Sequence, residues 1–149
     1  MSKGTGMMMT DPAEALAFVR GGKAVFTLVS KRSGVRFTFK VQRSDDALSF
    51  VHLRTGKWDV EGEEPWTYVG VIRHGERFDL TAKSQLLGTS DPIKAITWTM
   101  TQLAGGQLPS DQLEFWHEGQ CSACGLPLTD PESIKRGFGP TCWAVRKRQ

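Results

Sequence analysis

The sequence lacks any stretch long and apolar enough to cross a membrane, and residues 1–10 lack the apolar core of a secretory signal. It also has no internal repeat and no long low-complexity tract. Of its 149 residues, 39% are hydrophobic and 23% are charged, which are ordinary proportions for a globular chain. These features predict a cytoplasmic protein with a flexible leader at residues 1–10, one compact domain and a small appendage.

Motifs of several enzyme classes are missing as well. The chain has no phosphate-binding loop, no helix-borne pair of histidines and no nucleophile elbow. Its net charge of +3 is too small to indicate a nucleic-acid partner by itself. The sequence therefore favours a non-enzymatic protein, whose partner has to be inferred from local features.

Cysteine is scarce, and its distribution is the strongest signal in the chain. Cys121 and Cys124 are separated by two residues, and Cys142 follows later in the same segment. The short spacing lets a tight turn aim two thiolates at one ion, and Gly125 can adopt the positive φ that such a turn needs. With Cys142 as the third ligand and His117 as the fourth, the sequence predicts a closed, structural Zn²⁺ site.

Other interpretations of the cysteines fit the surrounding residues less well. A redox Cys-x-x-Cys pair precedes a helix, whereas Pro127 comes soon after this pair. A disulfide would leave one odd cysteine, and no signal peptide indicates an oxidising compartment. His52 and His74 compete with His117 as the fourth ligand. A hydrolytic zinc site that uses the nearby Glu118 is the remaining enzymatic alternative.

Residues 11–110 have the pattern of an α+β domain. A first helix is expected from Asp11, which can cap it, to the glycines at 21 and 22. Alternating residues then predict an antiparallel sheet of four or five strands with one buried and one wet face. The expected strands cover residues 24–31, 35–42, 48–54, 66–74 and 77–82. A helix capped by Asp91 and ending at Ala104 is expected to cover the buried face.

Residues 111–149 are predicted to form a zinc-binding module. A short strand is expected at residues 113–118, and a capped helix at residues 129–137. Cys142 would then stand at the start of a final basic helix, where the helix macrodipole favours its thiolate. This order, a cysteine turn and then a ligand at a helix start, is treble-clef-like. Trp98, off the apolar stripe of the main helix, is expected to pack against this module.

Two segments are candidates for binding a macromolecular partner. After Glu132 the chain has five basic residues and no acidic one, which indicates either a surface for DNA or RNA phosphates or a simply solvated end. The candidate nucleic-acid-binding residues are Lys135, Arg136, Trp143, Arg146, Lys147 and Arg148, with Trp143 placed to stack on a base. An acidic loop carries Trp58 and Trp66, which either bind a partner protein or fold back onto the sheet.

Basic residues also occur along the expected strand at residues 35–42 and just after it. Arg36 and Lys40 alternate with the buried residues, and Arg43 lies just beyond the strand. Such a face could bind phosphate groups, but cations on a wet strand also guard it against edge pairing. Because this strand has no aromatic residue on the same face, the sequence favours a solvated strand.

The cysteine-bearing segment resembles a module of small, uncharacterised phage and prophage proteins. The resemblance lies in the run from Trp116 to Ile134 and in the Gly-x-Gly-Pro-x-Cys sequence that ends at Cys142. Residues 26–38 resemble the sheet region of the same proteins. The resemblance implies a zinc-binding phage protein in an infected or lysogenic host cell, without implying an activity. The alternative to nucleic-acid association is a phage factor that binds a host protein and inhibits or adapts host defence machinery.

Overall fold

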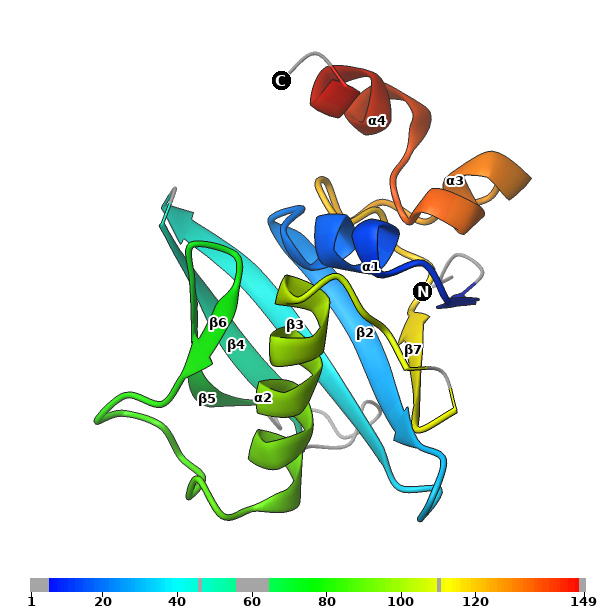
Figure 1. The fold of residues 1–149 in the computed structure, drawn as a ribbon. Coiled ribbons are helices and arrows are strands. Elements are labelled where there is room, and N and C mark those ends of the chain that lie inside the picture. The colour runs from blue at the N-terminus through cyan, green and yellow to red at the C-terminus, as the bar shows by residue number, and fades with distance from the viewer. Residues whose placement is uncertain (1–5, 46, 56–64, 110, 148–149) are drawn as a thin grey trace.

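The computed structural model describes residues 6–45, 47–55, 65–109 and 111–147, which form an α+β fold (Figure 1). The strands are β1 (Met7–Met9), β2 (Lys23–Ser30), β3 (Arg36–Asp45), β4 (Leu48–Arg54), β5 (Trp66–Arg73), β6 (Arg77–Asp79) and β7 (Leu113–His117). The helices are α1 (Pro12–Val19), α2 (Asp91–Ala104), α3 (Pro131–Arg136) and α4 (Pro140–Lys147). The α+β class and the antiparallel sheet are confirmed.

The sheet has more strands than the four or five that were predicted. Within the described residues it has seven, in the order β1-β7-β2-β3-β4-β5-β6. β7 is the strand expected before the cysteines, but it lies inside the sheet, where Phe115 stands opposite both Leu28 and Met9. Residues 7–9, assigned to the leader by the sequence, form β1 because Met9 fills a buried position at the edge of the core. The sheet therefore joins residues 7–9, near the start of the described chain, to residues 113–117.

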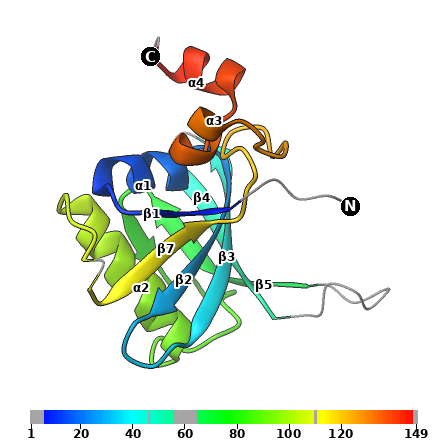
Figure 2. The same cartoon turned by 90° about the vertical axis from the view of Figure 1, so that its right-hand side faces the viewer.

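Helices α1 and α2 lie on the same side of the sheet (Figure 2). Asp11 caps α1 as expected, because its carboxylate accepts a hydrogen bond from the backbone N–H of Ala13. The residue before α2 is Ser90, and Asp91, which was expected to cap this helix, is its first residue. No helix in the described part of the chain is both long and apolar enough to cross a membrane.

The core lies between these helices and the inward face of the sheet. Buried residues of α2 recur at helical spacing and pack with the inward residues of the strands. Aromatic rings form its centre: the Phe26 ring stacks on that of Phe115, with centroids 4.7 Å apart, and lies 6.0 Å from that of Phe39. Trp98 packs against this core and not against the cysteine-bearing segment, which corrects the sequence prediction.

Candidate metal centre

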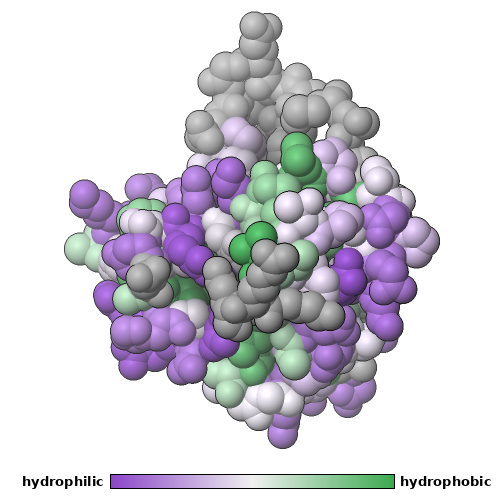
Figure 3. Space-filling model, turned by 90° about the horizontal axis from the view of Figure 1, so that it is seen from above, coloured by the Kyte–Doolittle hydropathy of each residue, from purple (hydrophilic) through white to green (hydrophobic). Residues whose placement is uncertain are grey.

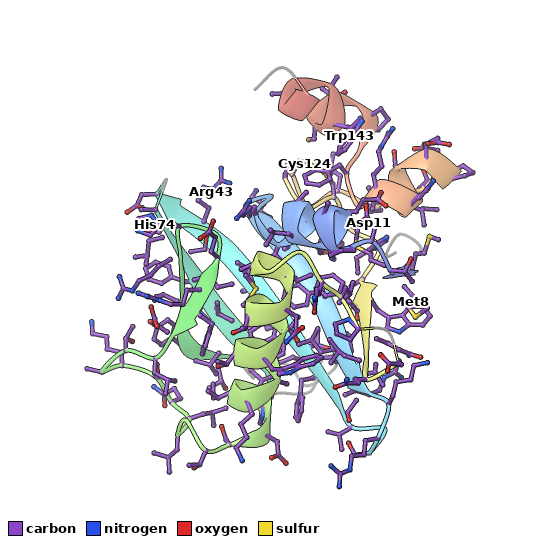
Figure 4. All side chains as sticks on the ribbon, viewed as in Figure 1. Met8, Asp11, Arg43, His74, Cys124 and Trp143 are labelled. Carbon is purple, nitrogen blue, oxygen red and sulfur yellow. The ribbon has the colours of Figure 1, made fainter. Side chains whose placement is uncertain are left out.

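The structure brings the three cysteines together at one end of the sheet. The sulfurs of Cys121, Cys124 and Cys142 all lie within 4.8 Å of one another. A tetrahedral ion with metal–sulfur bonds of about 2.3 Å holds its sulfurs about 3.8 Å apart, so the three thiols are placed to share one ion. Cys121 is buried, Cys142 is half-buried and Cys124 is exposed. Figure 4 shows Cys124 and Trp143 in the region between α1 and α4.

The first two cysteines are held in a tight turn. The backbone N–H of Gly125 donates to the carbonyl of Cys121 at 2.9 Å, and the N–H of Cys121 donates to the carbonyl of Leu126 at 2.8 Å. Gly125 has a φ of 80°, in the left-handed region that favours glycine. The N–H of Gly139 reaches into the turn and donates to the Cys121 sulfur at 3.3 Å. The local sequence thus fixes the direction of the first sulfur.

The third cysteine is delivered by two short helices. The Asp130 carboxylate caps α3 by accepting a hydrogen bond from the N–H of Ser133 at 3.1 Å, and Gly137 ends this helix with a φ of 80°. α4 begins at Pro140, so Cys142 lies in its first turn. The predicted succession of turn, capped helix and cysteine-bearing helix is therefore present.

Contacts with α1 fasten this segment to the rest of the molecule. Cys121, Leu128 and Phe138 form a small buried cluster, separate from the main core. The Ser122 hydroxyl donates to the Phe18 carbonyl, and its backbone N–H donates to the Gly137 carbonyl at 2.9 Å. The Phe18 ring meets that of Phe138 edge-on, with centroids 6.5 Å apart. The sulfurs consequently have a fixed position relative to α1.

His117, the predicted fourth ligand, is not brought to the sulfurs. It is buried in β7 and stacks on the Phe18 ring, with centroids 5.6 Å apart. Its Nδ1 accepts from the N–H of Gly119 at 3.0 Å, and its Nε2 donates to the Ile134 carbonyl at 2.5 Å. Burial lowers the pKa of His117 and outweighs the opposing effect of the Ile134 carbonyl. His117 is thus a neutral core residue, because backbone groups hold both of its ring nitrogens.

The other candidate ligands also lie elsewhere. The His52 ring, on β4, is 5.7 Å from the Tyr68 ring, and His74 lies in the turn between β5 and β6 with a φ of 55°. Glu118 accepts a hydrogen bond from the Thr27 hydroxyl on the sheet. Within the described residues, no histidine, aspartate or glutamate joins the three cysteines of the sulfur cluster as a fourth ligand.

The thiols differ in how readily they ionise. Burial raises the pKa of Cys121, but hydrogen bonds from the backbone, with that of Gly139 foremost, hold it below its usual value. Burial and the adjoining sulfurs of Cys121 and Cys124 raise the pKa of Cys142 to about 12. The Cys121 thiol therefore ionises more readily than that of Cys142. A bound metal ion would favour the thiolate form of all three.

The predicted nucleic-acid-binding residues are only partly described. Lys135 is exposed, while the Arg136 guanidinium lies 5.0 Å from the centroid of the Trp143 ring. Trp143 also packs on Phe138 at 5.7 Å, so its ring already has protein neighbours. The side chains of residues 146–149 lie outside the described part of the chain. Figure 3 looks down onto this end of the molecule, where hydrophilic surface surrounds a few apolar residues.

Of the two predicted partner-binding tryptophans, the structure describes only Trp66. Trp58 lies outside the described residues. Trp66 is the first residue of β5 and is half-buried, with the Lys40 ammonium group 4.9 Å from its ring centroid. Sequence reasoning did not identify this pairing, because Lys40 and Trp66 belong to strands that are not consecutive in the chain.

Comparison with known proteins adds one finding. Residues 111–147 match the model of a family of unknown function (DUF6011). This segment includes β7, the three cysteines and helices α3 and α4, so the similarity covers the sulfur cluster together with the strand before it. No curated protein and no solved structure matches the chain.

Proposed function

We propose that this chain is a non-enzymatic zinc-binding protein that associates with nucleic acid. The observation that carries the proposal is the cluster of three cysteine sulfurs within 4.8 Å. Thiolate ligands favour Zn²⁺ over harder divalent ions such as Mg²⁺ and Ca²⁺. A treble-clef-like centre follows, in which the ion would tie the first turn of α4 to the turn between Cys121 and Cys124.

The role proposed for the ion is structural. The buried apolar cluster beside the sulfurs is small, since its buried members are Cys121, Leu128 and Phe138. So little buried area stabilises α3 and α4 only weakly, and an ion bound by three thiolates would supply much of their stability. Water or a group from another molecule would complete the coordination. Glu118, the candidate catalytic base, is hydrogen-bonded to Thr27 on the sheet, which supports a structural centre.

Nucleic-acid association is proposed from the charge of the C-terminal segment. After Glu132 the chain has five basic residues and no acidic one. Helices α3 and α4, which carry most of these residues, stand at one end of the molecule above α1 (Figure 1). Basic side chains in such a position can contact phosphates in a salt-dependent way. Together with the resemblance to phage proteins, this supports a role in the cytoplasm of an infected or lysogenic host cell.

The metal is tested by measuring the zinc content of the purified protein. We expect one zinc per chain, lost in Cys124→Ser because only two thiolates remain. Thr141→Ala is the matched control: it changes an exposed residue beside Cys142 and should leave the zinc content unchanged. A wild-type protein without metal, or with a disulfide between Cys121 and Cys124 in reducing buffer, would contradict the proposal.

The partner is tested by titrating single- and double-stranded DNA and RNA at two salt concentrations. Replacing Arg146, Lys147 and Arg148 by Gln should weaken binding to all sequences, and each lost phosphate contact should lower the salt slope by about one unit. Zinc content should not change. If the wild-type protein binds no nucleic acid at low salt, the host-protein alternative replaces this proposal, and Trp58→Ala is then tested in a pull-down from host lysate.

A further inference from the structure

The sheet has an open face, which we define as the side turned away from α1 and α2. No described helix covers this side (Figure 2). The strand register places Val25, Lys40, His52 and Tyr68 in one row across it. These side chains are half-buried. On the other face, the adjacent row of Ala24, Val41 and Val51 is buried in the core. The open face is thus a broad surface of partly accessible side chains.

Aromatic rings from several strands share the open face. Trp66 on β5 lies beside Lys40 of β3, and Trp116 on β7 stands opposite Thr27 of β2. Phe50, on β4, is 39% exposed, and its ring centroid is 6.1 Å from that of Tyr68. The reason for treating β3 as merely solvated was that it carries no aromatic residue on this face. That reason does not hold for the sheet, because its neighbours supply the rings.

Basic side chains lie among these rings. The cations that the register places on the open face include Lys23, Arg36, Lys40 and Arg54, and, at the β6 edge, Arg73 and Arg77. Other groups engage the described acidic residues of this face. Asp79 pairs with Arg73 and Arg77 at the β6 edge, and Asp45 accepts a hydrogen bond from the backbone N–H of Ala47. Glu114 pairs with Lys31 at 3.4 Å and accepts a hydrogen bond from the Trp116 indole, while Glu118 accepts from the Thr27 hydroxyl. The charge of the face is therefore complementary to an anionic ligand.

The open face is also hollowed beside Trp66. A cavity of about 160 Å³ is lined in part by Lys40, Trp66 and Gln120. A second hollow of about 310 Å³ shares Lys40 and Gln120 with the first and extends to Gly125 in the cysteine turn. The two hollows form a path from the Trp66 ring toward the cysteine turn.

We infer that the open face binds single-stranded nucleic acid. Bases would stack on Trp66, phosphates would contact Lys40 and Arg36, and the strand would continue toward the cysteine turn. Unpaired bases expose their faces to aromatic rings, whereas the bases of a duplex are already stacked on one another. The inference rests on the proposed nucleic-acid association, and it names a surface and a form of nucleic acid for it.

The inference is tested by fluorescence anisotropy with a labelled oligothymidylate of about 16 nucleotides, a typical site size. The matching duplex is the comparison. Trp66→Ala should weaken single-strand binding about 5- to 150-fold, the usual loss for one stacking ring, and Trp66→Phe should retain most of the affinity. Lys40→Gln should lower the salt slope by about 0.7, the value for one phosphate contact on a single strand.

Trp98→Ala is the matched control, because Trp98 is another half-buried tryptophan but lies on α2, on the covered side of the sheet. It should bind like the wild type. If Trp66→Ala fails to fold by circular dichroism, Arg36→Gln at an exposed position takes its place. Unchanged binding by the open-face variants, or a preference for duplex, overturns the inference, while the C-terminal variants still test the proposed function. A wild-type protein that binds neither probe overturns both.

Discussion

Phe18 connects the two apolar clusters of the molecule. Its side chain is fully buried, and its ring meets that of Phe115 in the main core and that of Phe138 beside the sulfurs, both edge-on. Its third ring neighbour is His117. A substitution of this one residue should therefore weaken the packing of both the main core and the cysteine-bearing segment.

Truncating Phe18 tests this connection. Phe18→Ala should lower the free energy of unfolding by about 3–5 kcal/mol, as for other buried phenylalanines. Phe50→Ala, at a position that is 39% exposed, should cost less than about 1 kcal/mol. Guanidinium unfolding of both variants measures the difference. Equal losses would show that Phe18 does not join the two clusters.

His117 makes the stability depend on pH. Burial depresses its pKa in the folded state, so the unfolded state binds more protons once the pH falls below about 6.5. The contribution of His117 is therefore complete above that pH and is lost as the pH falls. His117→Gln should show a shallower decline between about pH 7 and pH 5 than the wild type, measured by urea unfolding at each pH.

Comparing His117→Gln with the wild type removes the contribution that both proteins share through their cysteines. Identical slopes for the wild type and His117→Gln would contradict the assignment. The sequence suggested a metal ligand here because histidine near a Cys-x-x-Cys pair is typical of zinc sites. The register of β7 instead turns the ring into the core.

At the scale of elements, local signals were sufficient wherever an element depends on its own residues. The hairpin of β2 and β3, the strand β4 and the helix α2 follow from alternation, glycine turns and helical spacing. The pairing of β1 with β7 could not be predicted, because it joins Met7 to His117 across most of the chain. The open face was missed for a similar reason, since its rings come from β4, β5 and β7.

The end of α3 illustrates how tightly one element can be fitted to another. Gly137 has a φ of 80°, and a Cβ atom there would lie 2.4 Å from Cδ2 of Phe18. Gly34, in the turn between β2 and β3, has a φ of 74°, but nothing lies within 4 Å of such an atom. An alanine would have a strained backbone at both positions, but only at position 137 would its Cβ atom also clash with a neighbour.

This pair separates strain from contact. Gly34→Ala should cost about 1–2 kcal/mol, the usual penalty of a left-handed conformation for alanine. Gly137→Ala should cost clearly more, because either Phe18 or α3 has to move. Thermal and chemical unfolding of both variants give the comparison. Similar losses at the two positions would show that α3 adjusts without strain.

For the whole molecule, the main core and the cysteine-bearing segment are held together differently. The core is large and apolar, whereas the C-terminal cluster has three buried members beside the sulfurs. From the spacing of the cysteines, which is a local property, the sequence correctly predicted that the three lie together. It could not show that β7 belongs to the sheet and that the segment after it rests on α1.

Removing the proposed zinc ion should loosen one part of the molecule. With a chelator, amide exchange in α3 and α4 should rise by about tenfold or more, a loss of about 1.4 kcal/mol in local stability, while β2 to β5 remain protected. Hydrogen exchange with mass spectrometry measures this, and added Zn²⁺ should restore the protection. Uniform loss of protection would show that the ion supports the entire fold.

The position of β7 between β1 and β2 has a consequence for synthesis on the ribosome. β2 emerges long before β7, so one of its edges has no partner until residue 117 has left the exit tunnel. An unpaired edge is a template for other chains, which makes this interval prone to aggregation. A fragment of residues 1–110 would keep that edge permanently and should aggregate in light scattering while the full chain does not. The sequence places a domain boundary at this point, but the chain cannot be cut there without opening the sheet.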